Sequence, residues 1–414
     1  MSNLVETSIP WIGQVPTDWD IKPLFSVATE NKTKNKERNE NVLSLSYGRI
    51  IRRDLSKNLG LLPENFNGYQ VVETGYIIIR STDLQNDKKS LRVGLVKENG
   101  VITSAYIGLS PSNTVHPEYL FYYLNMCDLK KVFYSLGGGL RQSLRFEEFK
   151  RFPAIVPSID EQKLISQYLD KKTSQIDSLV EKIQKKIDLL KEQRTSLINH
   201  YVTKGLDPNA EMKDSGVEWI GEIPKHWKLS RVKFELNIHN NNRVPLSAEV
   251  RGDRQGEYPY YGSTSIIDWV DDYLFDGRFI LLAEDGGNLV LRNLRLSFIV
   301  EGKFWVNNHA HILKSENDLY DHYYCEFLEQ SDFTTFITGS AQPKLTLEAI
   351  KTVPVCVPNE DEISEITSEL RTIKNQFRKL IEIHEKKIKY LKEYRQSLIS
   401  SVVTGKVRVT KDMV

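Results

Sequence analysis

The sequence has few cysteines and no long apolar run. Cys127, Cys325 and Cys356 are far apart and form no Cys-x-x-Cys pair, so we expect reduced thiols rather than a disulfide framework or a zinc site. No stretch of 18 or more residues is apolar, so no membrane-spanning helix is predicted. Residues 1–12 lack a basic segment followed by an apolar one, and no secretory signal is predicted. These absences favour a cytoplasmic protein without membrane contact.

Signatures of catalysis are also missing. The chain has no Asn/Asp-Pro-Pro-Tyr/Phe motif for methylating an exocyclic amine and no Gly-x-x-x-x-Gly-Lys-Ser/Thr loop for the phosphates of ATP. The run Gly137–Gly139 is not a Gly-x-Gly-x-x-Gly motif and is better interpreted as a contact loop. The sequence therefore predicts a protein that is not an enzyme and holds no cofactor.

Two groups of polar residues have side chains of the types found in metal and nuclease sites. His309 and His311 are two residues apart and would share one face of a strand, but no further ligand cluster is near them in the sequence. A nuclease would need a Glu/Asp-x-Lys partner beside the acidic residues, and none is present. We therefore expect no metal, and we interpret the acidic group as a solvated face or a partner-binding surface. That group comprises Asp271, Asp272, Asp276, Glu284 and Asp285.

The net charge is only +1, but it is unevenly distributed. Residues 207–352 carry 15 basic and 23 acidic side chains, a net charge of −8, whereas residues 1–150 carry 19 and 16, a net charge of +3. Any binding of nucleic acid by the acidic region must therefore use a local patch or a partner.

An internal repeat dominates the sequence. The segment Trp11-Ile-Gly-Gln-Val-Pro16, with Trp19 three residues on, returns as Trp219-Ile-Gly-Glu-Ile-Pro224 with Trp227. Residues 160–203 align without a gap on 361–404, and 19 of 44 positions are identical. The chain is therefore one unit of roughly 200 residues written twice.

Each aligned segment has the start and stop signals of a helix. Ser158 with Glu161, and Asn359 with Glu362, are spaced as an N-cap residue and its capping-box partner. Glycines at 205 and 405 mark the two ends. Two helices of about 40 residues are predicted, each roughly 60 Å long.

Apolar residues within these helices alternate in steps of four and three, which is the 3.5-residue period of a coiled-coil seam. Each seam holds one arginine at the corresponding position, either to fix the register or to extend its charge from the seam edge into water. Because each helix has one apolar stripe, its copy is the expected partner, packed antiparallel rather than parallel. The predicted seams are Ile176, Val180, Ile183, Ile187, Leu190, Arg194 and Leu197, and Phe377, Ile381, His384, Ile388, Leu391, Arg395 and Leu398.

The globular segments, residues 25–152 and 228–352, share landmarks but differ in sequence. Residues 75–80 and 277–282 are each predicted to form a buried strand, and residues 119–124 and 323–328 to form a short amphipathic helix. Short strands, glycine-bearing turns and one or two helices predict α+β domains. The predicted fold is two α+β domains joined by two long antiparallel coiled-coil helices, with a pseudo-two-fold internal repeat.

The combined motifs resemble those of the specificity subunit of type I restriction-modification systems. The resemblance rests on the Trp-Ile-Gly-x-Val/Ile-Pro-x-x-Trp motif, the Glu-x-Arg-x-Ser-Leu-Ile segment in each helix and the loop Gly339-Ser-Ala-Gln-Pro-Lys-Leu345. It covers nearly the whole chain. The resemblance implies target-recognition domains at residues 1–152 and 207–352, with conserved spacer helices at 153–206 and 353–414.

The resemblance further implies a non-catalytic subunit that reads double-stranded DNA. Each domain would read one half of a bipartite asymmetric site, and the coil would set the spacer and dock two methylation subunits. Restriction subunits would join that complex. S-adenosylmethionine, ATP and magnesium would belong to those partners rather than to this chain.

Candidate DNA contacts are polar and aromatic side chains on predicted loops. Arginine reads guanine and also binds phosphate, asparagine and glutamine read adenine, and lysine favours phosphate. In the first domain the candidates are Tyr47, Arg49, Arg52, Arg53, Arg80, Ser81, Lys88, Lys89, Arg141, Gln142 and Arg145. In the second domain they are Tyr260, Tyr261, Ser263, Thr264, Arg292, Asn307, Asn308, His309, Gln342 and Lys344.

Two alternatives remain open from the sequence. One is a coiled-coil scaffold that joins protein partners without touching DNA, which the acidic second domain favours. The other is an enzyme of unrecognised type, which the missing motifs argue against.

Overall fold

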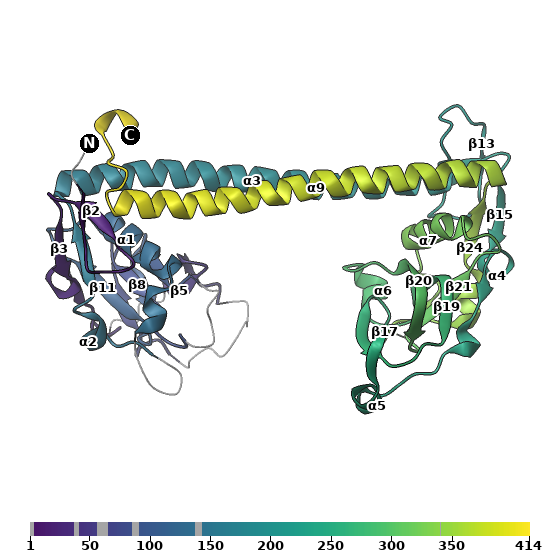
Figure 1. Cartoon of the computed structure of the whole chain (residues 1–414), viewed down its shortest axis with the longest axis horizontal. Coiled ribbons are helices and arrows are strands. Elements are labelled where there is room, and N and C mark those ends of the chain that lie inside the picture. The colour runs from purple at the N-terminus through teal and green to yellow at the C-terminus, as the bar shows by residue number, and fades with distance from the viewer. Residues whose placement is uncertain (1–3, 37–40, 56–64, 85–90, 137–142, 340) are drawn as a thin grey trace. The chain divides into compact units, whose positions relative to one another are not determined.

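Two compact units make up the chain. The structure, a computed structural model, describes residues 4–36, 41–55, 65–84, 91–136, 143–339 and 341–414. Unit 1 comprises residues 1–184 and 386–414, and unit 2 comprises residues 185–385. The long helices α3 (Ile159–Lys204) and α9 (Glu360–Val403) each contribute one part to each unit (Figure 1).

The two long helices run antiparallel within each unit. In unit 1 the start of α3 lies beside the end of α9, and Arg408 pairs with Glu161 there. In unit 2 the end of α3 lies beside the start of α9, where the side chain of Glu362 lies next to Gly205. The predicted α+β fold with two long helices packed together is thus confirmed.

Unit 1 is built from small antiparallel sheets that pack against the helices. A four-stranded sheet has the order β4-β11-β8-β9, and strand pairs β1-β2, β3-β12, β5-β6 and β7-β10 surround it. The strands are β1 (Leu4–Glu6), β2 (Gln14–Pro16), β3 (Asp20–Pro23), β4 (Ala28–Glu30), β5 (Leu43–Ser46), β6 (Arg49–Arg52), β7 (Gln70–Val72), β8 (Ile77–Ile79), β9 (Val93–Leu95), β10 (Gly100–Ile102), β11 (Ile107–Pro111) and β12 (Pro153–Val156). The helices are η1 (Leu24–Ser26), α1 (Pro117–Leu129), η2 (Val132–Ser135), α2 (Phe146–Phe149) and η4 (Lys411–Met413).

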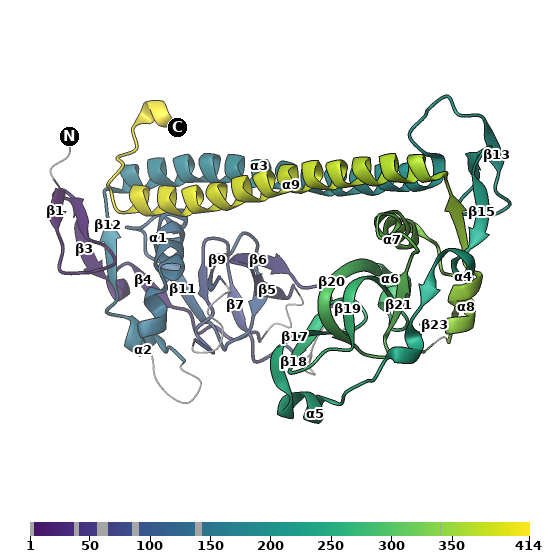
Figure 2. The ribbon, with the colours of Figure 1, turned by 45° about the vertical axis from the view of Figure 1, so that its right-hand side comes forward.

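Unit 2 is built around a six-stranded mixed sheet of order β16-β21-β19-β20-β17-β18, in which β17 and β20 are parallel. Helix α7 lies between this sheet and α9 in both views (Figures 1 and 2). The strands are β13 (Met212–Asp214), β14 (Glu222–Pro224), β15 (Lys228–Arg231), β16 (Asn237–Ile238), β17 (Gln255–Tyr261), β18 (Ile266–Val270), β19 (Phe275–Ala283), β20 (Ser297–Val306), β21 (Ala310–Lys314), β22 (Ile337–Thr338), β23 (Lys344–Leu345) and β24 (Pro354–Val357). The helices are α4 (Val232–Glu235), η3 (Asn240–Asn242), α5 (Ala248–Asp253), α6 (Asn288–Leu291), α7 (Tyr320–Gln330) and α8 (Leu347–Thr352).

The repeat is retained around the helices and lost in the sheets. Strand pairs β1-β2 and β3-β12 of unit 1 have counterparts in β13-β14 and β15-β24 of unit 2. Helices α1 and α7 contain the two predicted amphipathic segments, and both predicted buried strands form, as β8 and within β19. Each domain thus keeps the same frame against the helices but builds a different sheet on it.

The predicted helix caps form only in part. The backbone amide of Glu161 donates to the Ser158 hydroxyl at 3.4 Å, and that of Glu362 donates to Asn359 Oδ1 at 2.9 Å. The two N-cap residues are thus confirmed. The Glu161 carboxylate accepts from the Ser158 hydroxyl at 3.0 Å and also pairs with Arg408, but neither glutamate accepts from the backbone amide of its N-cap residue. The Glu362 carboxylate bonds to His226 and Trp227. They connect each helix start to neighbouring segments rather than closing a capping box.

Every residue of the two predicted seams is buried or half-buried in the structure. Ile187 and Ile183 of α3 and Phe377, Ile381 and Leu398 of α9 are among the buried ones. The two seam arginines differ, because Arg395 places Nε 3.0 Å from Asp177 Oδ1, whereas position 378, which corresponds to Asp177 in the repeat, is an arginine.

Candidate nucleic-acid interface

Each globular domain is bonded to one of the long helices by a buried tyrosine. The Tyr119 hydroxyl lies 3.0 Å from the carbonyl oxygen of Ile155 and 3.4 Å from that of Val403 in α9. The Tyr323 hydroxyl lies 3.0 Å from the carbonyl oxygens of both Cys356 and Val202, the latter in α3. Burial raises the pKa of both phenols well above the ordinary value, so both remain neutral donors.

The tryptophan motif of each copy packs on the helix end of the other copy. A Cβ atom added at Gly405, just after α9, would lie 2.4 Å from the ring of Pro16 and 3.1 Å from Trp19. A Cβ atom added at Gly205, just after α3, would lie 3.1 Å from Trp227. The motif therefore packs against the glycine that follows a long helix in each unit. Its role is structural, and it is not part of a DNA-binding surface.

A second contact between each domain and its helix differs between the copies. In unit 1 the Tyr122 hydroxyl donates to Asp170 at 2.6 Å and lies 3.2 Å from the Thr173 hydroxyl. At the corresponding place in unit 2, Glu326 binds Lys374 at 2.6 Å and Arg295 at 2.9 Å. A hydrogen bond from a phenol to a carboxylate in unit 1 and an ion triad around the buried Glu326 in unit 2 thus have the same structural role.

The predicted contact hairpin of the first domain is formed by β5 and β6. Tyr47 lies in its turn with a φ of 47° and is 86% exposed, and Gly48 follows with a φ of 75°. These left-handed residues match the two-residue turn that antiparallel hairpins favour. Arg52 is exposed and Arg53 is half-buried, while Arg49 places its guanidinium 3.6 Å from Asp177 of α3. The hairpin therefore presents an aromatic side chain and arginines near the coil.

The other predicted contacts of the first domain are spread more widely. Arg80 is half-buried, and its carbonyl oxygen accepts from Arg92. Ser81 is buried, and its hydroxyl donates to the carbonyl oxygen of Ala105. Arg145 is exposed and pairs with Glu148 at the start of α2. The predicted contacts Lys88, Lys89, Arg141 and Gln142 lie outside the described residues, as does the loop at residues 137–142.

The second domain brings two of its predicted loops together around Glu284 and Asp285. The amide of Glu284 donates to the carbonyl oxygen of His309, and the carbonyl oxygen of Glu284 accepts from the amide of Leu345. Gly286 likewise donates to Pro343. The loop at residues 307–309 and the loop at residues 342–344 therefore flank one turn at the end of β19.

Glu284 is the centre of a charged cluster that the sequence did not reveal. Its carboxylate contacts Arg243 at 2.5 Å, Lys344 at 3.2 Å and His311 at 3.6 Å. Burial favours a raised pKa for Glu284, but the hydrogen bond from Arg243 and the nearby positive charges hold the pKa below its ordinary value. Arg243 is about forty residues away in the chain, so no local motif linked it to Glu284.

The two histidines face different partners and do not converge. The Nε2 atom of His311 donates to the carbonyl oxygen of Leu345 at 2.7 Å, so its Nδ1 accepts from Asn240 at 2.8 Å. Burial lowers the pKa of His311, which keeps the ring neutral. His309 Nδ1 lies 2.8 Å from Asp285, an acceptor that fixes the proton on Nδ1. Across the described residues, no group of three or more histidine, cysteine or acidic side chains is placed to hold a metal.

Asn307 and Asn308 differ in exposure. The Asn307 side chain is buried and accepts from the amide of His309 at 2.8 Å, which shapes the loop. Asn308 and Gln342 are exposed, and the side chain of Lys344 is about half exposed. Asn308, His309, Gln342 and Lys344 are therefore the predicted polar residues on the surface of this cluster.

The remaining predicted contacts of the second domain are largely structural. Tyr260 is fully buried and its hydroxyl accepts from the amide of Leu246. Tyr261, Ser263 and Thr264 are half-buried in and after β17. Arg292 donates to the carbonyl oxygens of Glu329 and Ser331, so its guanidinium is bound at the end of α7.

The acidic residues interpreted from the sequence as one group are separated in the structure. Asp271 and Asp272 pair with Arg254 before β19, whereas Glu284 and Asp285 follow β19 at its other end. The sequence interpretation of a single acidic surface is therefore wrong. Most of this negative charge is matched locally by arginine, lysine or histidine.

Comparisons with known proteins agree with this architecture. The model of the family described as "Type I restriction modification DNA specificity domain" matches residues 16–189 and 224–393, one segment in each copy of the repeat. A type I restriction enzyme specificity subunit of Haemophilus influenzae is 36% identical over 122 residues, which are 30% of this chain and 31% of that protein. The type I restriction enzyme MjaIX specificity subunit of Methanocaldococcus jannaschii is 22% identical over 435 residues, which cover 96% of this chain and 95% of that protein.

A solved structure supports the fold independently of sequence. It is described as "Structural basis underlying complex assembly and conformational transition of the type I R-M system" and matches with a TM-score of 0.69. The match covers 95% of this chain and 99% of that chain at 12% sequence identity. Among the helices of the described residues, none is long and apolar enough to cross a membrane.

Proposed function

Because this chain belongs to the family of DNA specificity subunits of type I restriction-modification systems, we propose that its two globular domains each read one half of a bipartite asymmetric site. The recognition domains are residues 1–152 and 207–352. The observation that carries the proposal is that the two copies share a similar frame of helices and strand pairs but build different sheets on it. A constant frame positions each domain, and different surfaces read different sequences.

The long helices set the spacer between the half-sites and dock two methylation subunits. Each helix is 44 to 46 residues long, which is roughly 65 to 70 Å at 1.5 Å per residue. One turn of B-DNA is about 34 Å, so helices of this length can bridge half-sites that are separated by unread base pairs. S-adenosylmethionine, ATP and magnesium are supplied by the methylation and restriction subunits, which fits the missing motifs in this chain.

The first domain reads its half-site with the β5-β6 hairpin. A two-stranded ribbon fits the major groove, where arginine pairs bidentately with guanine. Arg52 and Arg53 follow the turn at Tyr47, and no described residue forms an ion pair with Arg52. Lys88, Lys89, Arg141 and Gln142 lie outside the described residues and are proposed as DNA contacts on the sequence alone.

The second domain reads its half-site with Asn308, His309, Gln342 and Lys344. Asparagine and glutamine recognise adenine, and Lys344 contacts phosphate. The carboxylates of Glu284 and Asp285 hold Lys344 and His309 in place, so part of the negative charge of this acidic domain is matched locally. Its affinity would come from a few oriented groups and from the partner subunits rather than from bulk charge.

The proposed function is tested by methylome sequencing of a host that produces the methylation subunit with different forms of this chain. The unaltered chain is expected to produce one bipartite methylated motif, and omission of the chain none. Inserting one heptad into both α3 and α9 is expected to lengthen the spacer and leave both half-sites unchanged. Exchange of residues 25–152 for another recognition domain is expected to change one half-site only.

Two outcomes would contradict the proposal. Identical methylomes with and without the chain would show that it supplies no DNA specificity. Altered half-sites with an unchanged spacer in the heptad variant would show that the helices do not set the spacing.

The hairpin contact is tested by Arg52→Ala in the assembled complex. A lost arginine contact to guanine costs about 1 to 3 kcal/mol, so specific DNA affinity is expected to fall roughly 5- to 150-fold. If Arg52 contacts phosphate instead, the slope of log affinity against log salt should fall by about 1. Fluorescence anisotropy with a duplex carrying the methylated motif measures both quantities.

Lys22→Ala is the matched control, because Lys22 is also exposed in unit 1 and pairs with Asp20 on β3. It is expected to leave DNA affinity and the salt slope unchanged. An Arg52 variant that behaves like the Lys22 variant would exclude the hairpin arginine from the interface.

A further inference from the structure

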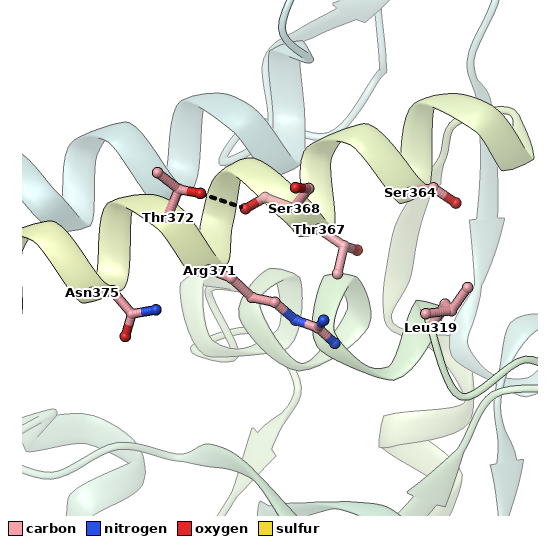
Figure 3. Close-up of a pocket in the computed structure, with 7 residues that line it drawn as sticks. All are labelled: Leu319, Ser364, Thr367, Ser368, Arg371, Thr372 and Asn375. Carbon is pink, nitrogen blue, oxygen red and sulfur yellow. Dashed lines mark hydrogen bonds between the residues drawn. The ribbon is translucent and has the colours of Figure 1, made fainter.

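A polar cavity lies on the N-terminal part of α9 in unit 2. It has a volume of about 240 Å³ and opens between α9 and the residue before α7. Its lining is Leu319, Ser364, Thr367, Ser368, Arg371, Thr372 and Asn375. Figure 3 shows that all but Leu319 project from the same side of α9 and that the Arg371 guanidinium extends toward α7.

The cavity contains hydrogen-bond donors without partners among the described residues. Thr367 is 3% exposed and its hydroxyl has no hydrogen-bond partner. Arg371 forms no ion pair within the described part of the chain, and the Asn375 carbonyl accepts from Arg378, which leaves its amide nitrogen free to donate. Unmatched buried polar groups are rare in proteins because each costs free energy, so the buried Thr367 hydroxyl calls for an explanation.

The surroundings of the cavity are positively charged. No carboxylate belongs to its lining. The neighbouring His322 on α7 has its pKa lowered to about 4 by burial and by the charges of Arg371, Arg278 and Lys374. Lys374 and Arg278 already have carboxylate partners in Glu326 and Glu301, whereas the charge of Arg371 is unmatched. The cavity therefore has room, donors and an excess positive charge.

The corresponding face of α3 in unit 1 is different. Thr367 corresponds to Ser166, whose hydroxyl donates to the carbonyl oxygen of Gln162 at 2.8 Å. Arg371 corresponds to Asp170, which accepts from Tyr122. In unit 1 the backbone of α3 satisfies the first position and the domain satisfies the second, so the open donors are specific to unit 2 and do not follow from the repeat.

From this geometry we infer that the cavity receives one carboxylate side chain of the methylation subunit that docks on α9. This inference rests on the proposed function. Pockets for whole ligands are usually about 300 to 1,000 Å³, so this smaller cavity suits a single side chain rather than a nucleotide. A carboxylate can accept from the Arg371 guanidinium and the Thr367 hydroxyl together. A phosphate of duplex DNA belongs to a wide and stiff double helix, so it can enter such a recess less easily than a projecting side chain can.

The test compares Thr367→Val and Arg371→Glu in the full chain, with Lys379→Glu as the control. Thr367→Val keeps the shape and removes the unpartnered hydroxyl, so the free chain should melt at a higher temperature while its affinity for the methylation subunit falls at least threefold. Opposite effects on stability and binding are not expected of a merely structural residue. Arg371→Glu should weaken binding at least tenfold, whereas Lys379→Glu, the same charge change elsewhere on α9, should change binding less than twofold.

Isothermal titration calorimetry measures binding to the methylation subunit, and fluorescence anisotropy measures binding to duplex DNA. Weaker protein binding with unchanged DNA binding by the free chain supports the inference. Unchanged protein binding in both cavity variants overturns it, as does a loss confined to DNA binding, which would assign the cavity to a phosphate. If the unaltered chain does not bind the methylation subunit at all, the proposed function fails and this inference fails with it.

Discussion

Gly405→Ala is expected to destabilise unit 1 by about 3 kcal/mol. Gly405 has a φ of 72°, and an added Cβ atom would lie 2.4 Å from the Pro16 ring, which cannot rotate away. Forcing an atom into a packed site costs about 1 to 3 kcal/mol, and a left-handed conformation costs an alanine about 1 to 2 kcal/mol more. Urea unfolding followed by circular dichroism measures the loss.

Gly13→Ala is the matched control for this variant. Gly13 belongs to the same unit and has nearly the same φ of 71°, but its added Cβ atom would meet only the end of the Lys406 side chain at 4.0 Å. It should lose only the backbone cost, about 1 to 2 kcal/mol. Equal losses in the two variants would mean that the tryptophan motif does not pack closely on the helix end.

Glu326→Ala is expected to destabilise unit 2 by about 1.5 to 3 kcal/mol, because it removes the charge-assisted hydrogen bonds of a buried carboxylate to two half-exposed cations. Glu326 is 2% exposed, and its Oε1 atom contacts both Lys374 of α9 and Arg295. Glu301→Ala is the control, since the Glu301 side chain is 58% exposed in its pair with Arg278. An exposed pair contributes about 1 kcal/mol at most. A loss in Glu326→Ala no larger than that of the control would show that the triad does not hold the domain on α9.

The same residue gives unit 2 a dependence on acid pH. Burial favours a raised pKa for Glu326, but the charges of Arg295 and Lys374 outweigh it and lower the pKa below the ordinary value of 4.5. The stability that Glu326 provides is therefore fully present above pH 4.5 and is lost as the pH falls through the lowered pKa. Glu326→Gln should lack this part of the pH profile, which parallel urea unfolding from neutral to acid pH would detect.

The contacts that Tyr122 and Glu326 make with the long helices differ, so the two domains are not interchangeable at this point. The first domain meets its helix through a hydrogen bond from Tyr122 to Asp170, and the second meets its helix through the Glu326 triad. A first domain placed in the second position would set a tyrosine against Lys374 and leave that lysine without its carboxylate. The tyrosine contacts of Tyr119 and Tyr323, by contrast, would survive the exchange.

The sequence by itself determined the repeat, the two long helices, their N-caps and the alternation of domain and helix. These features depend on local periodicity and on residues close in the chain, so a single sequence contains them. The sequence similarity of the two helices also indicated that both domains are mounted on the same structural frame. The differing globular segments indicated that the two domains present different surfaces. Both expectations agree with the paired strands and tyrosine contacts that surround the helices.

Only the tertiary structure decided which polar residues are available at the surface. Ser81 and Tyr260 looked like loop contacts in the sequence, but folding buries both, because their hydroxyls bond to main-chain groups distant in sequence. Arg243 and Glu284 are about forty residues apart and meet only when β16 and β19 both pair with β21, so no spacing could have revealed their cluster. The carboxylates of Glu161 and Glu362 likewise fit a local capping pattern, but both also bond to residues that are distant in the sequence. Burial and charge pairing are properties of segments brought together from different parts of the chain, and tertiary packing alone sets them.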